Sequence, residues 1–279
     1  YMNLSLKGKR AIVCGSTQGI GKAIALMLSK QKANITLVAR NETKLKNVLK
    51  ELDDSDNQQH NFIVADFNDP DKLKAHINTF LSEGYNAEIL INNTGGPPAG
   101  QIMNAKKEEF DQYISMHLHC SHILVKALVP YMKKSKFGRI VNIISVSVKA
   151  PIQNLGISNT VRWAMASWSK TLSFELGKFG ITVNNIAIVD DTLESPIDEY
   201  TTIISPITYT TFNEYIVTMD REALEREILS ELPDYRYDIP LENIKKIDLK
   251  SMLIGVLTCA CFFLIMGQAS NNQNGRYQA

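Results

Sequence analysis

The sequence has little of several things that mark special classes of protein. Glycine and proline number only 15 and 9 in 279 residues, too few for a collagen-like repeat. The four cysteines are Cys14, Cys120, Cys259 and Cys261, which form no C-x-x-C pair and have no histidine cluster beside them. We therefore expect no metal site and no disulfide framework, and a reduced, cytoplasmic compartment is the expected location.

Net charge is also small, because 30 Lys and Arg residues face 29 Asp and Glu residues. The resulting +1 gives no reason to expect a nucleic-acid partner. Residues 1–189 nevertheless carry a net charge of +9, and residues 190–250 carry −9. This change of sign predicts two different surfaces, or segments of different origin. Residues 2–7 contain no long apolar run, so no secretory signal peptide is expected.

Short apolar runs alternate with segments of helical periodicity through the first two thirds of the chain. Apolar residues make up 44% of the sequence, enough for a sizeable core and too many for a disordered chain. The apolar runs predict strands at 10–14, 35–39, 62–65, 89–91, 139–145 and 181–188. The periodic segments predict helices at 22–32, 45–52, 70–83, 106–133 and 154–178. This alternation predicts an α/β fold with a doubly wound, Rossmann-like parallel sheet.

The pattern changes near residue 189, which predicts an atypical C-terminal extension. We expect a dinucleotide-binding catalytic domain at 1–189, an acidic lid or linker at 190–250, and an apolar segment with a polar tail at 251–279. The apolar stretch 252–266 has 15 residues, fewer than the about 20 that a membrane-spanning helix needs. Lysines that precede it can extend such a span. The stretch is thus interpreted as a buried last strand, as a membrane tail that would make the protein membrane-associated, or as a fusion or gene-model junction.

A glycine-rich turn stands between the first predicted strand and the first predicted helix. Its three glycines have the spacing G-x-x-x-G-x-G. Glycine lets the backbone approach phosphate groups, and the helix N-terminus offers free N–H groups and the positive end of its dipole. Between a strand and a helix, this pattern predicts a dinucleotide site rather than an empty tight turn. The residues expected to contact the cofactor here are Gly15, Ser16, Gln18, Gly19, Ile20 and Gly21.

Four motifs in order resemble the short-chain dehydrogenase/reductase family. The turn at 15–21 (Gly-Ser-Thr-Gln-Gly-Ile-Gly) is similar to its nucleotide loop, and 92–95 (Asn-Asn-Thr-Gly) to its N-N-A-G element. Residues 181–184 resemble its sixth strand, and Asp66 stands where the family places an Asp near the adenine. The resemblance covers about residues 7–188 and leaves the C-terminal third unmatched. It implies that the cofactor site also contains Asp66, Phe67, Asn93 and Gly95.

The residue after the second predicted strand bears on the choice of cofactor. An acid there would bind the ribose hydroxyls of NAD, but Ala39 is followed by Arg40. The planar guanidinium of Arg binds phosphate strongly, which suits the 2′-phosphate of NADP. The sequence therefore favours NADP(H) over NAD(H). The alternative interpretation is that Arg40 only forms a salt bridge on the surface.

The catalytic positions depart from the family pattern. In the family, a Ser polarises the carbonyl, a Tyr donates the proton, and a Lys lowers the pKa of that Tyr. Here Ser145 matches the Ser, but Ser158 and Arg162 replace the Tyr and the Lys, and His117 replaces an Asn of the long helix. The segment 154–162 resembles a divergent bacterial subgroup, labelled 3-oxoacyl-reductase-like, in which Ser-Asn-x-x-Arg also replaces Tyr-x-x-x-Lys.

These replacements leave the proton donor open. A Ser hydroxyl is a far weaker acid than a Tyr phenol, whose pKa is about 10. Arg162 stays protonated and cannot join a proton relay, but its positive charge can hold the ribose and phosphate side of the cofactor. His117 has an ordinary pKa of about 6.5 and is a candidate donor, although it can equally be a hydrogen-bonded helix histidine. The catalytic candidates are Ser145, Ser158, Arg162 and His117.

Two functions follow from these residues. The first is an NADP(H)-dependent oxidoreductase that interconverts a carbonyl and an alcohol on a small-molecule or acyl-chain substrate. The second is a nucleotide-binding protein without turnover, acting as a sensor or assembly partner. The resemblance also implies a homo-oligomer formed through the helices at 106–133 and 154–178, with Trp163, Trp168 and Phe174 as candidate interface residues.

Overall fold

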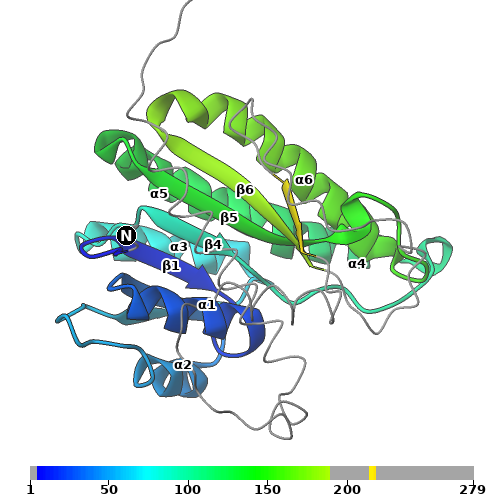
Figure 1. Cartoon of the computed structure of the whole chain (residues 1–279). Coiled ribbons are helices and arrows are strands. Elements are labelled where there is room, and N and C mark those ends of the chain that lie inside the picture. The colour runs from blue at the N-terminus through cyan, green and yellow to red at the C-terminus, as the bar shows by residue number, and fades with distance from the viewer. Residues whose placement is uncertain (1–4, 189–213, 218–279) are drawn as a thin grey trace, which may run out of the picture.

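The computed structural model describes residues 5–188 and 214–217. They contain a parallel sheet in the order β3-β2-β1-β4-β5-β6-β7 (Figure 1). The order in which successive strands are added to the sheet reverses between the neighbouring strands β1 and β4. This order confirms the predicted doubly wound α/β fold. The strands are β1 (Arg10–Cys14), β2 (Asn34–Ala39), β3 (Asn61–Val64), β4 (Ile89–Asn92), β5 (Gly138–Ser145), β6 (Ile181–Ile188) and β7 (Glu214–Val217).

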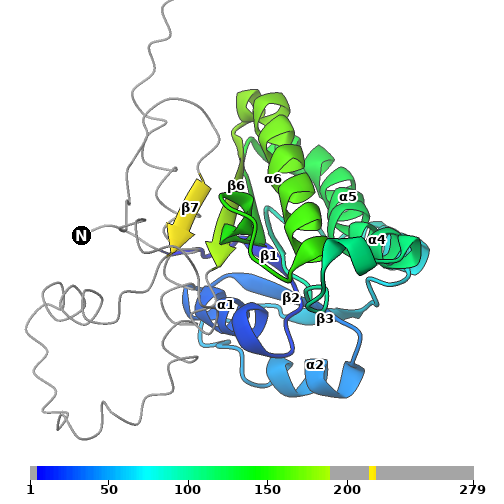
Figure 2. The same ribbon diagram turned by 90° about the vertical axis from the view of Figure 1, so that its right-hand side faces the viewer.

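Helices cover both faces of this sheet (Figure 2). One face packs against α1 (Gly19–Lys30) and α2 (Glu42–Leu49). The other face packs against α3 (Pro70–Ser82), α5 (Cys120–Ser135) and α6 (Gly156–Leu176). Short 3₁₀ turns occupy Ile102–Asn104, Val146–Val148 and Gly177–Phe179.

Burial on both faces explains why the strands read as continuous apolar runs. In β1, Ala11 and Val13 belong to the core under α1 and α2, and Ile12 and Cys14 belong to the core under α3 and α5. All four are at most 1% exposed. The bounds of the six predicted strands and of the first three predicted helices lie within three residues of those in the structure.

The predicted helix at 106–133 consists of three segments. α4 (Lys107–Ile114) continues into a π-helical turn (Ser115–His119), and α5 follows. A π-helical turn adds one residue to a helix and often lies at a functional site. Here it contains His117, which is buried against the loop that follows β4. Apolar periodicity predicted one continuous helix because a single wider turn hardly changes the pattern.

The seventh strand lies inside the region predicted as a lid or linker. β7 pairs in parallel with β6, from Asn185 with Glu214 to Ile188 with Val217. The sequence pattern predicts no strand there, because four residues are too few to show a period. The stretch 252–266 and the tail lie outside the described residues. Within the part that is described, no helix is long and apolar enough to cross a membrane.

A ladder of buried amides crosses the centre of the sheet. Asn92, Asn142 and Asn185 are register partners on β4, β5 and β6, and each is at most 4% exposed. Nδ2 of Asn92 donates to Oδ1 of Asn142 at 2.8 Å, and Nδ2 of Asn142 donates to Oδ1 of Asn185 at 3.1 Å. Nδ2 of Asn142 also donates to Oγ of Ser169 on α6. These bonds fix the register of the three central strands.

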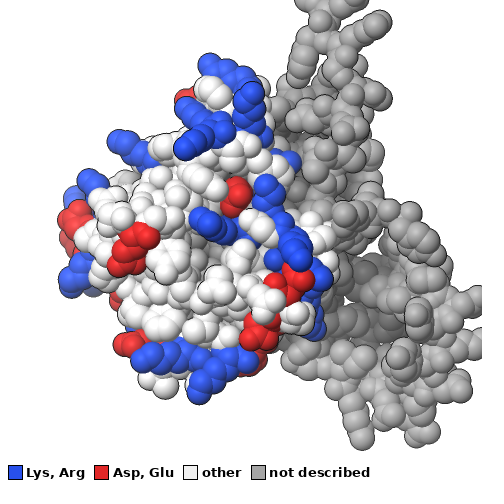
Figure 3. Space-filling view, turned by 90° about the vertical axis from the view of Figure 1, so that its left-hand side faces the viewer, with Lys and Arg blue, Asp and Glu red and all other residues white. Residues whose placement is uncertain are grey.

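The charged side chains of the described residues are spread over the surface. On the face in Figure 3, side chains of both signs are interspersed and separated by uncharged surface. This face therefore presents no continuous basic field of the kind that tracks a nucleic-acid backbone.

Candidate functional site

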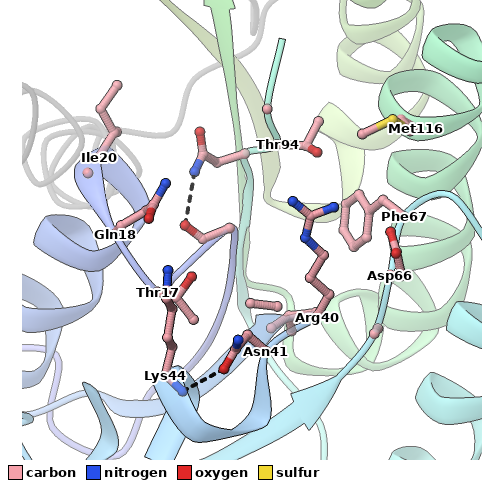
Figure 4. A pocket seen from close by; sticks show the side chains of 17 residues that line it. Thr17, Gln18, Ile20, Arg40, Asn41, Lys44, Asp66, Phe67, Thr94 and Met116 are labelled. Atoms are coloured by element: carbon pink, nitrogen blue, oxygen red, sulfur yellow. Dashed lines mark hydrogen bonds between the residues drawn. The ribbon is translucent and has the colours of Figure 1, made fainter. Parts of the chain in front are cut away.

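A cavity of about 530 Å³ lies at the carboxyl ends of the strands, where the strand order reverses (Figure 4). Open α/β sheets bind ligands at this position. The cavity is lined by four loops, namely those after β1, β2, β3 and β4, together with one residue of the π-helical turn. The lining residues are Gly15, Thr17, Gln18, Gly19, Ile20, Val38, Ala39, Arg40, Asn41, Lys44, Ala65, Asp66, Phe67, Asn93, Thr94, Gly95 and Met116. Every residue predicted to bind the cofactor lines it except Ser16 and Gly21.

Gly15 and Gly21 are required by the close approach of three backbone segments. A Cβ on Gly21 would lie 2.3 Å from the carbonyl oxygen of Gly15. A Cβ on Gly15 would lie 2.7 Å from Nδ2 of Asn93, and Gly15 also has a φ of +60°. Asn93 fastens the turn, since its Nδ2 donates to the carbonyl oxygen of Cys14 at 3.3 Å. Ser16 is fully buried, and its Oγ donates to the carbonyl oxygen of Val38.

Gly19 differs from the other two glycines. It has a φ of +56°, and a Cβ there would meet nothing within 4 Å. Gly19 is the first residue of α1, which begins without a capping side chain because the side chain of Gln18 makes no hydrogen bond to the first turn. The first turn also contains no acidic residue. Free N–H groups therefore stand beside open space, an arrangement that binds phosphate.

The end of β2 and the start of α2 bring two cations to the same cavity. Arg40 is exposed, and its side chain makes no hydrogen bond or ion pair with another described residue. The alternative interpretation of Arg40 as a surface salt bridge therefore has no acidic partner among the described residues. Figure 4 shows its side chain extending along the cavity. Lys44 lines the cavity too, and Oδ1 of Asn41 accepts a hydrogen bond from its backbone nitrogen at 2.9 Å. The sequence did not single out Lys44, which reaches the cavity only because α2 starts at Glu42.

The loop after β3 forms another part of the wall, with Asp66 and Phe67. Oδ1 of Asp66 accepts hydrogen bonds from the backbone and side-chain nitrogens of Asn68, at 3.0 and 2.9 Å. The carbonyl oxygen of Phe67 accepts a hydrogen bond from Sγ of Cys120 on α5. Both residues are thus held in place from behind the cavity wall.

His117 supports the loop after β4. Its Nε2 lies 3.1 Å from the carbonyl oxygen of Gly95, and because a carbonyl only accepts, this nitrogen carries the proton. Burial, helped by the charge of Arg162, lowers the pKa of His117 to about 3. The ring is therefore neutral at physiological pH, and its one N–H donates to Gly95. This geometry favours the hydrogen-bonded helix histidine over the proton donor.

Of the other predicted catalytic residues, Ser145 is the last residue of β5, and Ser158 and Arg162 lie on α6. Oγ of Ser145 accepts a hydrogen bond from the backbone nitrogen of Ser147 at 3.2 Å, which leaves the hydroxyl proton for another acceptor. Ser158 is 9% exposed, and its hydroxyl makes no hydrogen bond with a described residue. Nη1 of Arg162 donates to the carbonyl oxygen of Ile143 at 2.7 Å. Burial lowers the pKa of Arg162 to about 10, so it stays positively charged at neutral pH.

The short chain dehydrogenase family matches residues 9–190. Over 182 residues the chain is 31% identical to an uncharacterised oxidoreductase of Staphylococcus epidermidis, covering 65% of this chain and 77% of that protein. It is 30% identical to the 3-oxoacyl-[acyl-carrier-protein] reductase FabG of Chlamydia muridarum, covering 67% of this chain and 75% of the other.

Solved structures show the same relationship. The L-sorbose reductase of Gluconobacter frateurii, in complex with NADPH and L-sorbose, is 32% identical with a TM-score of 0.63. The match covers 67% of this chain and 71% of that one. From the family match and the shared fold, we conclude that the chain belongs to the short chain dehydrogenase family of oxidoreductases.

Proposed function

We propose that the protein is an NADP(H)-dependent oxidoreductase that interconverts a carbonyl and an alcohol. The observation that supports this most strongly is the cavity at the switch point of the sheet, with its glycine turn and two cations. NADPH is bound in the sorbose reductase to which this chain is similar.

The residues of the cavity fit the parts of this cofactor. The open space before Gly19 and the uncapped start of α1 suit a diphosphate. Arg40 and Lys44 suit a 2′-phosphate, because two cations at one end of the cavity offset its charge. Asp66 and Phe67 form the wall where an adenine would lie.

Reduction in this site uses the side chains at the end of β5. When bound, the nicotinamide supplies the hydride that adds to the carbonyl carbon. The hydroxyl of Ser145 donates a hydrogen bond to the carbonyl oxygen and so stabilises the negative charge that develops on that oxygen. Ser158 is too weak an acid, and the proton of His117 is held by Gly95. The proton that completes the alcohol therefore comes from solvent.

The proposal is tested by titrating the purified protein with NADPH and NADH, using tryptophan fluorescence and thermal shift. NADPH is expected to bind more tightly than NADH. Arg40→Gln should weaken NADPH binding about tenfold or more, because a charge-assisted hydrogen bond contributes about 1.5–3 kcal/mol. It should leave NADH binding unchanged. Lys126→Gln is the matched control, because Lys126 is exposed on α5 and its replacement also removes one positive charge. Folded protein that binds neither nucleotide would refute the proposal.

A nucleotide-binding protein without turnover is the second candidate. It is favoured by Ser158 and Arg162 at the positions where the family has Tyr and Lys, and by the neutral, occupied ring of His117. NADPH oxidation with a panel of ketones and oxo acids separates the two. Oxidation that depends on any of these carbonyl compounds excludes the second candidate, and tight binding with no oxidation across the panel supports it.

A further inference from the structure

Arg162 is a partly buried cation without an acidic partner among residues 5–188. Its Nε is buried and has no hydrogen-bond partner there. None of the ion pairs between described residues includes Arg162. Burying a charge is costly unless an opposite charge or a full set of hydrogen bonds offsets it. An anion that binds beside Arg162 would therefore be strongly favoured.

One side of the guanidinium has no hydrogen-bond partner among the described residues. Nη1 is used at Ile143, one residue beyond the last pair of the β4–β5 ladder, Asn92 with Asn142. Nη2 and Nε make up the remaining side, and two parallel N–H donors match the two oxygens of a carboxylate. Nη2 lies 3.5 Å from the position that a Cβ on Gly96 would take, and Gly96 is exposed. This side of Arg162 thus lies along the exposed loop that follows β4.

The phosphates of the proposed cofactor do not account for this cation. The diphosphate fits the turn after β1, and the 2′-phosphate fits Arg40 and Lys44 after β2. Arg162 instead contacts β5 and lies near Gly96, one residue after the cavity-lining Gly95. Ser145 follows two residues after Ile143 on the same strand, and Ser158 precedes Arg162 by one turn on the same face of α6. Within residues 5–188 and the proposed phosphate sites nothing supplies this anion, which points to the substrate as its source.

We infer that the substrate is a short oxo acid, or the corresponding hydroxy acid, whose carboxylate binds Arg162 while its carbonyl oxygen binds Ser145. The inference rests on the proposed function and names the substrate class of the same site. In the reduction, the hydride adds to the oxo carbon, a proton from solvent completes the hydroxyl, and the carboxylate is unchanged.

The test measures binding to the full chain saturated with NADP⁺, so that no hydride is transferred. Three acids that differ in the spacing of carbonyl and carboxylate are compared with their methyl esters: pyruvate, acetoacetate and levulinate. Isothermal titration and thermal shift give the affinity for each acid and for its methyl ester. At least one acid is expected to bind tenfold or more tightly than its ester, because the ester lacks the charge that Arg162 recognises.

Two variants connect the preference to Arg162. Arg162→Gln should remove the preference of acid over ester and leave the ester affinity in place, and Lys126→Gln should keep the preference. If Arg162→Gln does not fold, Arg162→Lys keeps the charge without the planar fork and should reduce the preference in part. If the unmodified protein binds NADP⁺ but binds no acid better than its ester, the inference about the substrate is wrong and the proposed function stands. Equal loss of NADP⁺, acid and ester binding in Arg162→Gln also overturns it, by assigning Arg162 to the cofactor. Failure to bind NADP⁺ in the unmodified protein refutes the proposed function instead.

Discussion

Replacing Gly21 with Ala tests the nucleotide turn at its tightest contact. The new Cβ would lie 2.3 Å from the carbonyl oxygen of Gly15 and 2.8 Å from Nδ2 of Asn93. Real Cβ atoms essentially never approach closer than 3.0 Å, so the two segments must separate by about 0.7 Å. The oxygen of Gly15 belongs to the backbone of a turn with a φ of +60°, and no side-chain rotation can relieve the contact.

Two opposing effects set the size of the change. Ala is favoured over Gly inside a helix by about 1 kcal/mol, and Gly21 lies in the first turn of α1. Overpacking a tightly packed site costs about 1–3 kcal/mol, and the upper part of that range, about 2–3 kcal/mol, applies here because a backbone atom has to move. The steric effect exceeds the helix preference, so we expect a net loss of about 1–2 kcal/mol in the free energy of unfolding. For a folded unit of this size that is a fall in Tm of about 2–8 °C.

The assay combines urea denaturation with NADPH titration. Gly21→Ala should lower the stability as above and weaken NADPH binding tenfold or more, because the displaced turn contacts the diphosphate in the proposed complex. Gly100→Ala is the matched control, since a Cβ at Gly100 meets nothing within 4 Å and its φ is not positive. If Gly21→Ala and Gly100→Ala behave alike in both measurements, the reasoning about the turn is wrong.

Three further predictions concern other parts of the molecule. Between pH 7 and pH 5 the protein should lose about 2 kcal/mol of unfolding free energy through His117, because the unfolded ring gains a proton near pH 6.5 while burial holds its folded pKa at about 3. His117→Asn should flatten the pH dependence of the urea midpoint by that amount, and an unchanged slope would contradict the assigned cause. Asn93→Ala should cost about 1 kcal/mol in urea and weaken NADPH binding, since the turn loses its bond to Cys14, and wild-type affinity would contradict this role. Trp163 and Phe174 are 49% and 61% exposed on α6, so replacing both with Ser should shift a dimer or tetramer toward monomer in analytical ultracentrifugation. A wild-type protein that is already monomeric would refute that interface.

The order and covering of the sheet could be predicted because they follow from patterns that local sequence displays. Strands buried on both faces are continuous apolar runs, and the helices between them show a clear period. The right-handed crossover rule then fixes the doubly wound arrangement. The nucleotide turn could be predicted for the same reason, since Gly15, Gly19 and Gly21 are needed by its own backbone.

Other features depend on contacts that local sequence does not display. Lys44 reaches the cavity only because Asn41 caps the N-terminus of α2 at that point. The π-helical turn orients His117 toward Gly95. The sequence does not reveal this turn, because one wider turn hardly changes the apolar period. Trp168, a candidate for an oligomer interface, is partly buried against the core and makes an edge-on ring contact with His122. In each case the deciding partner lies in another segment of the chain.

The amide ladder of β4, β5 and β6 has a consequence for how this family member can change over time. Asn92 and Asn185 each depend on Asn142, whose side-chain nitrogen also holds α6 through Ser169. An apolar residue at Asn142 alone would leave two buried amides and a hydroxyl without that partner, each costing about 1–3 kcal/mol. An apolar replacement of all three asparagines leaves far fewer groups unpaired. Substitutions at these three positions should therefore occur together, so that among descendants of this sequence the central strands keep the whole ladder or lose it as a set.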